Sequence, residues 1–301
     1  MKPVKRHLLN LHIWSTLFDL MCGSLITPFF FFPTLSGSPS GLLTEMRIPT
    51  LIQICLTFCV FGGLCSAIIY VFENRQYVLC ENTNRFRLQN PNARGIYYGV
   101  VFVYCCVSIY PFSWNVPEQI SAKIRVLDII PCPNPEFFSG NTYVFKAPED
   151  TAAFGYFGLC FTVFLTSQIS FFGGNCFCIL YALDNITLSA HSKRLQKKFF
   201  ITICIQIFIP MWIVVLPLSY FLGSLFTGYY SQSLNNLTSI FFSCHGFLST
   251  ICLLSMNPPY REATFNASLS IISFFAPNCK NRLVECNRPG RTSFVVSTIS
   301  R

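Results

Sequence analysis

One acidic residue, Asp19, lies near the middle of an apolar run close to the N-terminus. A carboxylate at the centre of a lipid bilayer costs about 2.5–3.5 kcal/mol, so Asp19 is expected to face other protein. Polar residues recur around it at helical spacing and form one stripe, made of His12, Ser15, Thr16, Asp19, Cys22 and Gly23. The stripe is either a ligand-sensing site, with His12 and Asp19 as candidates, or a structural hydrogen-bond network. The network is favoured, because no basic partner for Asp19 is visible.

His245 is a second candidate for chemistry, and it is followed by Gly246. A metal site or a proton relay would need another histidine or acid nearby, and none is evident in the sequence. We therefore predict a structural histidine beside a closely packed glycine. No CxxC pair recurs with zinc spacing, so no metal and no cofactor are predicted.

Enzymatic chemistry is not expected of this chain. Hydrolysis within a membrane needs a pair of acids, a nucleophile with a histidine, or a metal motif such as HExxH. The apolar runs hold one Asp and two histidines far apart in sequence, which provide none of these. The net charge of +9 does not indicate a nucleic-acid partner either, because the basic residues form short patches between apolar runs. Such patches are typical of contacts with anionic membrane lipid.

The elements that position these residues are predicted to be membrane helices. Hydrophobic residues make up 52% of the 301 residues and charged residues only 11%, about half the charged share of a soluble domain. About 20 apolar residues are needed to cross a bilayer. Six runs are near or above this length, namely 8–32, 50–72, 96–114, 154–181, 199–222 and 237–256. The sequence therefore predicts an all-α membrane protein with six transmembrane helices.

Lysine and arginine counts predict the orientation of these helices. Of the 21 basic residues, 17 lie in the termini and the even-numbered loops. Because cytoplasmic segments are enriched in Lys and Arg, both termini are expected in the cytoplasm. The loop 115–153 is then the main extracellular feature, and residues 266–301 form a basic cytoplasmic tail that follows a membrane domain at 1–265.

Several motifs carry a resemblance to a known family. They are LLNLHIWSTLFDL at 8–20, FENR at 72–75, VPEQ at 116–119, PCPNPEFF at 131–138, SKRLQKKFFITICIQIFIP at 192–210, NNLTSIFFSCHGFLST at 235–250 and PYRE at 259–262. In this order they closely resemble the nematode serpentine chemoreceptors of class h, the Srh family. The resemblance implies a G-protein-coupled-receptor helix bundle, a small-molecule ligand such as an odorant, and a heterotrimeric G protein as partner. It also implies the plasma membrane, particularly that of chemosensory neurons.

The resemblance also implies roles for particular residues. In the general receptor fold, an acid-polar-Arg triplet at the end of the third helix holds the inactive state and meets the G protein. Glu73, Asn74 and Arg75 match it. The other residues expected at the G-protein surface are Lys193, Arg194, Lys197, Lys198, Tyr260 and Arg261. The alternatives are a charged helix cap for the triplet and a membrane anchor for the lysines.

Three cysteines receive weaker assignments, two from the same fold and one from the residue pattern of the tail. A disulfide between Cys55 and Cys132 would match the extracellular tether common in it. Cys279, after an amphipathic stretch beyond Arg261, is a candidate palmitoylation site.

The chain departs from the family in one respect. Its first apolar run resembles the family's second helix, so the six runs correspond to helices 2–7 and the first helix is missing. A truncated or decayed, non-signalling copy is therefore one alternative to a working receptor. A six-helix channel or transporter is the other. It is less favoured, because no membrane run is rich in arginine and no two halves are related.

Overall fold

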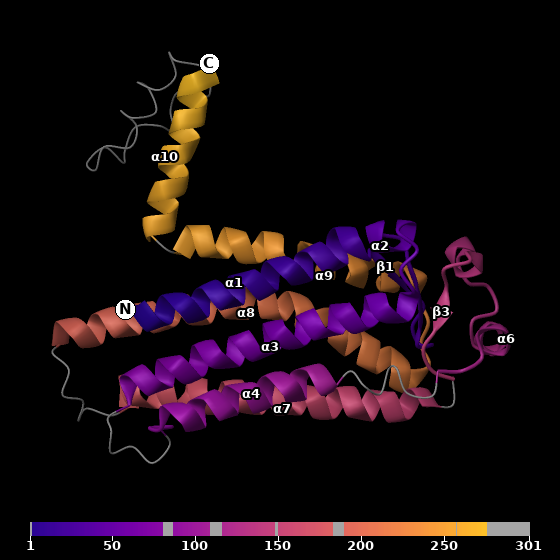
Figure 1. Ribbon diagram of the computed structural model, residues 1–301, viewed down its shortest axis with the longest axis horizontal. Coiled ribbons are helices and arrows are strands. Elements are labelled where there is room, and N and C mark those ends of the chain that lie inside the picture. Colours follow the sequence, from indigo (N-terminus) through magenta and orange to yellow (C-terminus); the bar gives the residue numbers. More distant parts are fainter. Residues whose placement is uncertain are drawn as a thin grey trace, which may run out of the picture. The chain divides into compact units, whose positions relative to one another are not determined.

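A computed structural model of the chain describes residues 2–80, 87–108, 116–147, 150–182, 190–256 and 258–275. The chain divides into two compact units, Met1–Ser249 and Thr250–Arg301. A long helix overlaps each predicted apolar run. These helices are α1 (Lys2–Leu20), α3 (Thr50–Leu79), α4 (Pro91–Val107), α7 (Thr151–Phe177), α8 (Ala190–Thr227) and α9 (Gln232–Met256), shown in Figure 1.

Short elements join these helices in the first unit. A π-helical turn extends α1 (η1, Met21–Leu25) and another extends α7 (η4, Cys178–Ala182). The remaining elements are the strands β1 (Pro28–Phe30), β2 (Ser36–Pro39) and β3 (Tyr143–Val144), the helices α2 (Leu42–Glu45) and α6 (Gln119–Ile129), and the 3-10 helix η2 (Pro135–Phe138). In the second unit, α10 (Pro258–Phe275) runs without a break across the domain boundary predicted at residue 265.

Helix α3 lies against three other helices. Its most extensive contacts are with α1, α7 and α4, and Figure 1 shows it between α1 and the α4–α7 pair. Two adjacent buried glycines allow this close approach. A Cβ on Gly62 would lie 2.8 Å from the Cys105 carbonyl oxygen on α4, and a Cβ on Gly63 would lie 2.4 Å from the Trp14 ring on α1. Small residues at such crossings are typical of helices that pack in membranes.

The first apolar run does not form one helix to Phe32, and this prediction is wrong at its end. The helical conformation stops at Leu25, and a strand begins at Pro28. Pro28 has no amide hydrogen to donate to a helix, and Thr27 adopts a positive φ of 46°. Both features prevent the helix from continuing, although the following residues are all apolar.

The phenylalanines after Pro28 alternate between two sides of a small sheet. Strands β1 and β2 form an antiparallel hairpin, and β3 joins the outer edge of β2, which gives the order β1-β2-β3. The Phe30 and Phe32 rings contact Phe221 on α8, with centroids 5.2 and 4.0 Å away. On the other side, Phe31 is fully buried against Phe137 of η2 at 5.2 Å. This alternation is the period of a β-strand.

Other boundaries differ by several residues from those predicted. Helix α3 continues from Phe72 to Leu79, and α8 begins at Ala190, nine residues before the predicted start at 199. Helix α4 begins earlier than residue 96, at Pro91, because the Asn90 side chain caps it by accepting the Asn92 amide at 2.9 Å.

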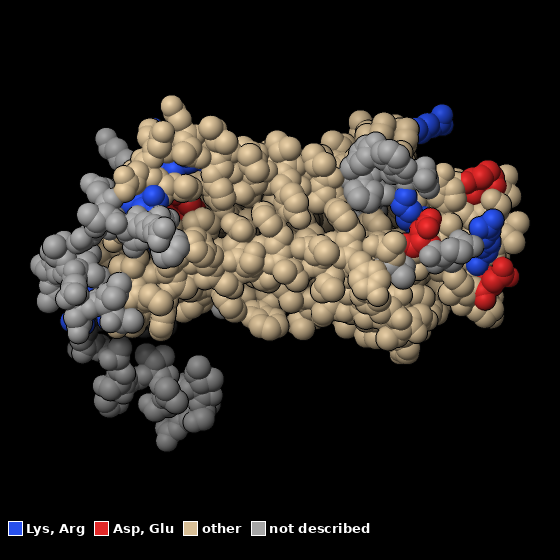
Figure 2. All heavy atoms as spheres, turned by 90° about the horizontal axis from the view of Figure 1, so that it is seen from below, with Lys and Arg blue, Asp and Glu red and all other residues tan. Residues whose placement is uncertain are grey.

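The described helices include clear candidates for membrane spans. Thr50–Leu79 and Ala153–Tyr181 are long and apolar enough to cross a bilayer, and Met211–Thr227 is a shorter apolar helix. Figure 2 shows that the Lys, Arg, Asp and Glu side chains on the face in view gather toward two ends, with a broad uncharged region between them. The total of six transmembrane helices stays a prediction.

Candidate functional site

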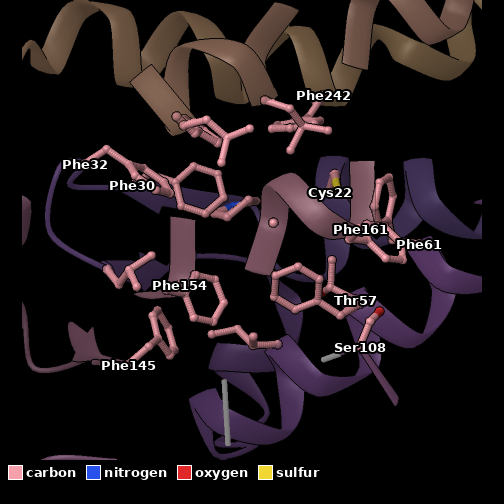
Figure 3. A pocket seen from close by; sticks show the side chains of 18 of the residues that line it. Cys22, Phe30, Phe32, Thr57, Phe61, Ser108, Phe145, Phe154, Phe161 and Phe242 are labelled. Carbon is pink, nitrogen blue, oxygen red and sulfur yellow. The ribbon is translucent and has the colours of Figure 1, made fainter. Parts of the chain in front are cut away.

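A partly open apolar cavity of about 250 Å³ lies between the helices and the hairpin. Residues of α1, η1, the hairpin, α3, α4, α7, α8 and α9 line it, together with Phe145 beyond β3. Eleven of the lining residues are phenylalanines, namely Phe18, Phe30, Phe32, Phe58, Phe61, Phe145, Phe154, Phe157, Phe161, Phe221 and Phe242. Figure 3 shows several of their rings turned toward one another across the space. Such a cavity suits a compact apolar molecule.

The described part of the cavity lining contains no charged side chain. Neither His12 nor Asp19, the two ligand candidates from the sequence, is part of it. Their neighbours Phe18 and Cys22 do line it, so the polar side chain of Asp19 lies just behind the cavity wall. An ionised ligand would lose its hydration without gaining a partner, and the arrangement therefore favours a neutral one.

Asp19 has the partner that the sequence did not reveal. Its Oδ1 lies 3.3 Å from Nδ1 of His245 on α9. A Cβ on Gly246 would lie only 1.4 Å from the Asp19 Oδ2 atom, so the carboxylate occupies the space that this glycine leaves. The prediction that no acid lies near His245 is wrong. The pair joins α1 to α9, and the His245 ring meets Phe18 of the cavity edge-on at 5.9 Å.

Only part of the predicted polar stripe on α1 and η1 lies inside the protein. Ser15 and Cys22 are buried, and His12 and Asp19 are half-buried. Thr16 and Gly23 are exposed, and for these two the prediction of one interior stripe is wrong. The stripe spans about 100° or more of the helix surface, and α1 turns only the centre of it toward its neighbours.

Glu73, in the FENR motif, forms a buried ion pair with an arginine on another helix. Arg94 of α4 donates two hydrogen bonds to the Glu73 carboxylate, at 2.9 and 2.7 Å. The Tyr98 hydroxyl donates to the same carboxylate and accepts from Arg94 at 2.9 Å. The Arg94 guanidinium also lies over the Tyr77 ring, 3.8 Å from its centroid. Glu73 is therefore part of a network between α3 and α4 and not an exposed helix cap.

Arg75 in the same motif points to α8. Its Nη2 atom donates to the side-chain oxygen of Gln196 at 2.5 Å and to the Gln196 carbonyl at 3.2 Å. The guanidinium lies over the Phe199 ring at 4.5 Å, and only 3% of the residue is exposed. Its buried Nε atom has no acceptor among the described residues. The structure thus ties α3 to the start of α8 through the triplet's arginine.

The other residues predicted at a G-protein surface lie in three settings. Arg194 and Lys198 are exposed on the first turns of α8, and Lys193 and Lys197 are half-buried there. Lys197 lies over the Tyr181 ring of η4, with Nζ 4.3 Å from its centroid. Arg261 is exposed on α10 in the second unit, and the side chain of Tyr260 lies outside the described residues, as does Cys279.

The disulfide predicted between Cys55 and Cys132 is absent. Both cysteines are free thiols in the structure. Cys55 lies on α3, and Cys132 is exposed in the segment between α6 and η2. The loop is instead held by the VPEQ motif, in which Gln119 exchanges hydrogen bonds with the Val144 backbone at 2.9 and 3.1 Å.

Glu118 of the same motif caps α6. Its carboxylate accepts the backbone amides of Ser121 at 2.8 Å and Ile120 at 3.0 Å. These hydrogen bonds lower the pKa of the Glu118 carboxyl, because they favour its ionised form. The motif therefore fixes both the start of α6 and its link to β3.

Sequence reasoning missed the partners of the triplet. Arg94 and Tyr98 lie four residues apart and so share one face of a helix, a spacing that could have indicated a site for an acid. Gln196 lies between the lysines of the basic patch, where nothing singled it out. Among the described residues, no group of three or more His, Cys, Asp or Glu side chains could hold a metal ion.

Comparison with known proteins identifies relatives. The family described as "Serpentine type 7TM GPCR chemoreceptor Srh" matches residues 1–269 of this chain. A curated relative from Caenorhabditis elegans, "Serpentine receptor class H-72", is 29% identical over 266 residues, which cover 87% of this chain and 74% of the relative.

The Glu73–Arg94 pair yields a prediction on stability. Glu73→Leu should lower the free energy of unfolding by about 3 kcal/mol, because it leaves the Arg94 guanidinium without its buried counterion. Thermal unfolding of the purified chain in detergent micelles would measure the effect. The double variant Glu73→Leu, Arg94→Met is the control and should recover most of the loss. Equal losses in the single and double variants would show that the pair is not coupled.

Proposed function

This chain belongs to the Srh family of serpentine seven-transmembrane chemoreceptors, and we propose on that premise that it binds a small apolar molecule and signals through a heterotrimeric G protein. The family membership confirms the resemblance read from the motifs. The single observation that supports the choice of ligand is the phenylalanine-lined cavity.

The size and chemistry of the cavity support a volatile or lipophilic ligand. An apolar cavity of about 150 Å³ is large enough to bind benzene, and this one measures about 250 Å³. It therefore accommodates a molecule somewhat larger than a single aromatic ring. Burial of apolar surface supplies the main driving force for binding, at about 25 cal/mol per Å². Environmental odorants of low polarity have these properties.

A side chain that fills the cavity should weaken the response of the chain to such molecules. Gly158 of α7 lines the cavity, and its added Cβ would meet only Leu222 at 3.4 Å, an ordinary contact. Gly158→Leu should therefore fold and place its side chain in the cavity, and it should raise the half-maximal odorant concentration at least about tenfold. Cells expressing the chain with a G-protein reporter, screened with neutral apolar odorants, would measure the response.

A matched control is available on the same helix. Gly174 of α7 is exposed, and nothing lies within 4 Å of its added Cβ. Gly174→Leu should respond like the unchanged chain at equal surface level. If Gly158→Leu keeps the full response, the cavity is not the ligand site. If no G protein is activated but the chain conducts ions, the channel alternative replaces the receptor.

The residues proposed for coupling belong to both compact units. Those of the first unit are Glu73, Asn74, Arg75, Lys193, Arg194, Lys197 and Lys198, and those of the second unit are Tyr260 and Arg261. Arg75 is buried and bound to Gln196, so it cannot contact a partner protein in this conformation. We take the present arrangement as the uncoupled state, in which α8 must release Arg75 before a G protein can bind it. Such a contact has two states, and a ligand that binds one state more tightly shifts the equilibrium toward that state.

Two variants separate the roles of this contact. Arg75→Ala should reach the surface and lose G-protein activation, because it removes the group that meets the partner. Gln196→Ala should instead raise basal activation several-fold, because it frees Arg75 from α8 and shifts the equilibrium toward the coupled state. Reporter activity at equal surface level measures both. If the Arg75→Ala chain responds fully, the triplet only holds the helices together and has no role in coupling.

We place the chain in the plasma membrane with both termini in the cytoplasm, because 17 of its 21 Lys and Arg residues fall on that side of the predicted topology. Tags added at Met1 and at Arg301 should both be digested by protease outside intact microsomes. Protection of one tag alone would contradict an even number of transmembrane helices.

A further inference from the structure

The cavity proposed as the ligand site contains few polar groups, and their hydrogen bonds can be accounted for one by one. Four hydroxyl side chains line it, those of Ser36, Thr57, Ser108 and Thr162. Each hydroxyl has one proton to donate and two lone pairs that accept. Whether these protons are already used decides what kind of ligand group the cavity can satisfy.

The three hydroxyls on helices donate their protons to the backbone. Thr57 donates to the Gln53 carbonyl on α3 at 3.0 Å, and Thr162 donates to the Gly158 carbonyl on α7 at 2.9 Å. Ser108 at the end of α4 donates to the Cys105 carbonyl at 2.7 Å. Each of these bonds returns to the preceding helical turn, as Ser and Thr commonly do in helices.

The fourth hydroxyl, that of Ser36 on the hairpin, donates its proton to the neighbouring Thr34 hydroxyl. The Thr34 hydroxyl donates to the Phe31 carbonyl at 2.6 Å, which uses its single proton. The Thr34 and Ser36 hydroxyl oxygens are 2.8 Å apart. Because Thr34 has no second proton, Ser36 must donate in this contact. None of the four hydroxyls therefore has a proton left to donate to a ligand in the cavity.

The remaining polar groups of the lining do not change this balance. Cys22 and Cys105 are free thiols, which are weak donors. Among the residues that the structure describes, no charged, amide, imidazole or indole side chain takes part in the lining. The cavity thus offers hydrogen-bond acceptors and almost no donors. A buried ligand oxygen that can only accept would be left without a partner, which is unfavourable.

We infer that the ligand of this chain is a neutral apolar molecule that carries a hydrogen-bond donor, namely an alcohol or phenol hydroxyl, and not an ether, ester or ketone of the same size. The inference rests on the proposed role of the cavity. Figure 3 shows Thr57 and Ser108 on the same side of the cavity. A ligand hydroxyl turned toward α3 and α4 would bond there.

A pair of isomers tests the inference directly. 4-Methylphenol and methoxybenzene have the same atoms, but only the phenol can donate. The full chain in lipid nanodiscs would be dialysed to equilibrium against each compound, with empty nanodiscs to subtract partition into lipid. We expect 4-methylphenol to bind about 2- to 12-fold more tightly, the effect of one net neutral hydrogen bond. Gly158→Leu should remove the binding of both compounds.

Variants of the acceptors provide a second test. Thr57→Val and Ser108→Ala together should bring the ratio of the two affinities close to one, because they remove the lone pairs and leave the apolar lining in place. Thr166→Val is the control on α7. Its hydroxyl is exposed and bonds to the Thr162 carbonyl at 2.9 Å, outside the cavity lining.

The outcomes separate the inference from the function on which it rests. If both isomers bind equally and Gly158→Leu removes both, the cavity is a ligand site and the inference is wrong. The same holds if methoxybenzene binds more tightly. If Gly158→Leu changes the binding of neither isomer, the cavity is not their site, and both the inference and the proposed function of the cavity are overturned.

Discussion

The close packing of α3 against its neighbours is the constraint on which the rest of the structure depends. Gly62 and Gly63 let α1 and α4 approach this helix more closely than any side chain would allow. Both functional regions are built on α3, because Thr57 and Phe61 line the cavity and Glu73 and Arg75 form the polar network. Phe61 and Glu73 are twelve residues apart, about 18 Å along a helix. One rigid element therefore joins the cavity to the network.

Much of the helical architecture could be predicted from the sequence, because hydropathy and length are local properties. Hydropathy did not reveal the end of the first helix, since Phe29 to Phe32 are as apolar as a membrane helix, whereas Pro28 was a local signal for it. The partners of the charged residues could not be predicted from the sequence either. Asp19 and His245 are 226 positions apart, and Glu73 pairs with Arg94 and not with its neighbour Arg75. Tertiary packing decides which charged residues pair, and a single sequence does not show which helices pack together.

The motifs that carried the family resemblance have a common physical role in this structure. Gln119, Gln196 and Asn235 each use a side-chain amide to bind a distant segment, with Asn235 donating to the Phe32 carbonyl at 3.1 Å. In a protein whose surfaces are mostly apolar, hydrophobic contact alone discriminates weakly between alternative helix pairings. Directional polar contacts supply that specificity. Several recognisable motifs therefore hold a polar residue that binds another segment, and two of them, at 8–20 and 235–250, also contribute Phe18 and Phe242 to the cavity lining.

The four consecutive phenylalanines 29–32, which begin in β1 and continue beyond it, have a consequence for how such a receptor can change over time. Phe30 and Phe32 face the cavity, whereas Phe29 and Phe31 face a separate cluster that holds the outer loop. Selection can therefore act on alternate positions of one short segment with different results. Substitutions at Phe30 or Phe32 alter the shape of the cavity, and those at Phe29 or Phe31 alter the packing of the loop. A lineage of duplicated genes could diverge in chemical preference through the first pair while the helical scaffold is inherited unchanged.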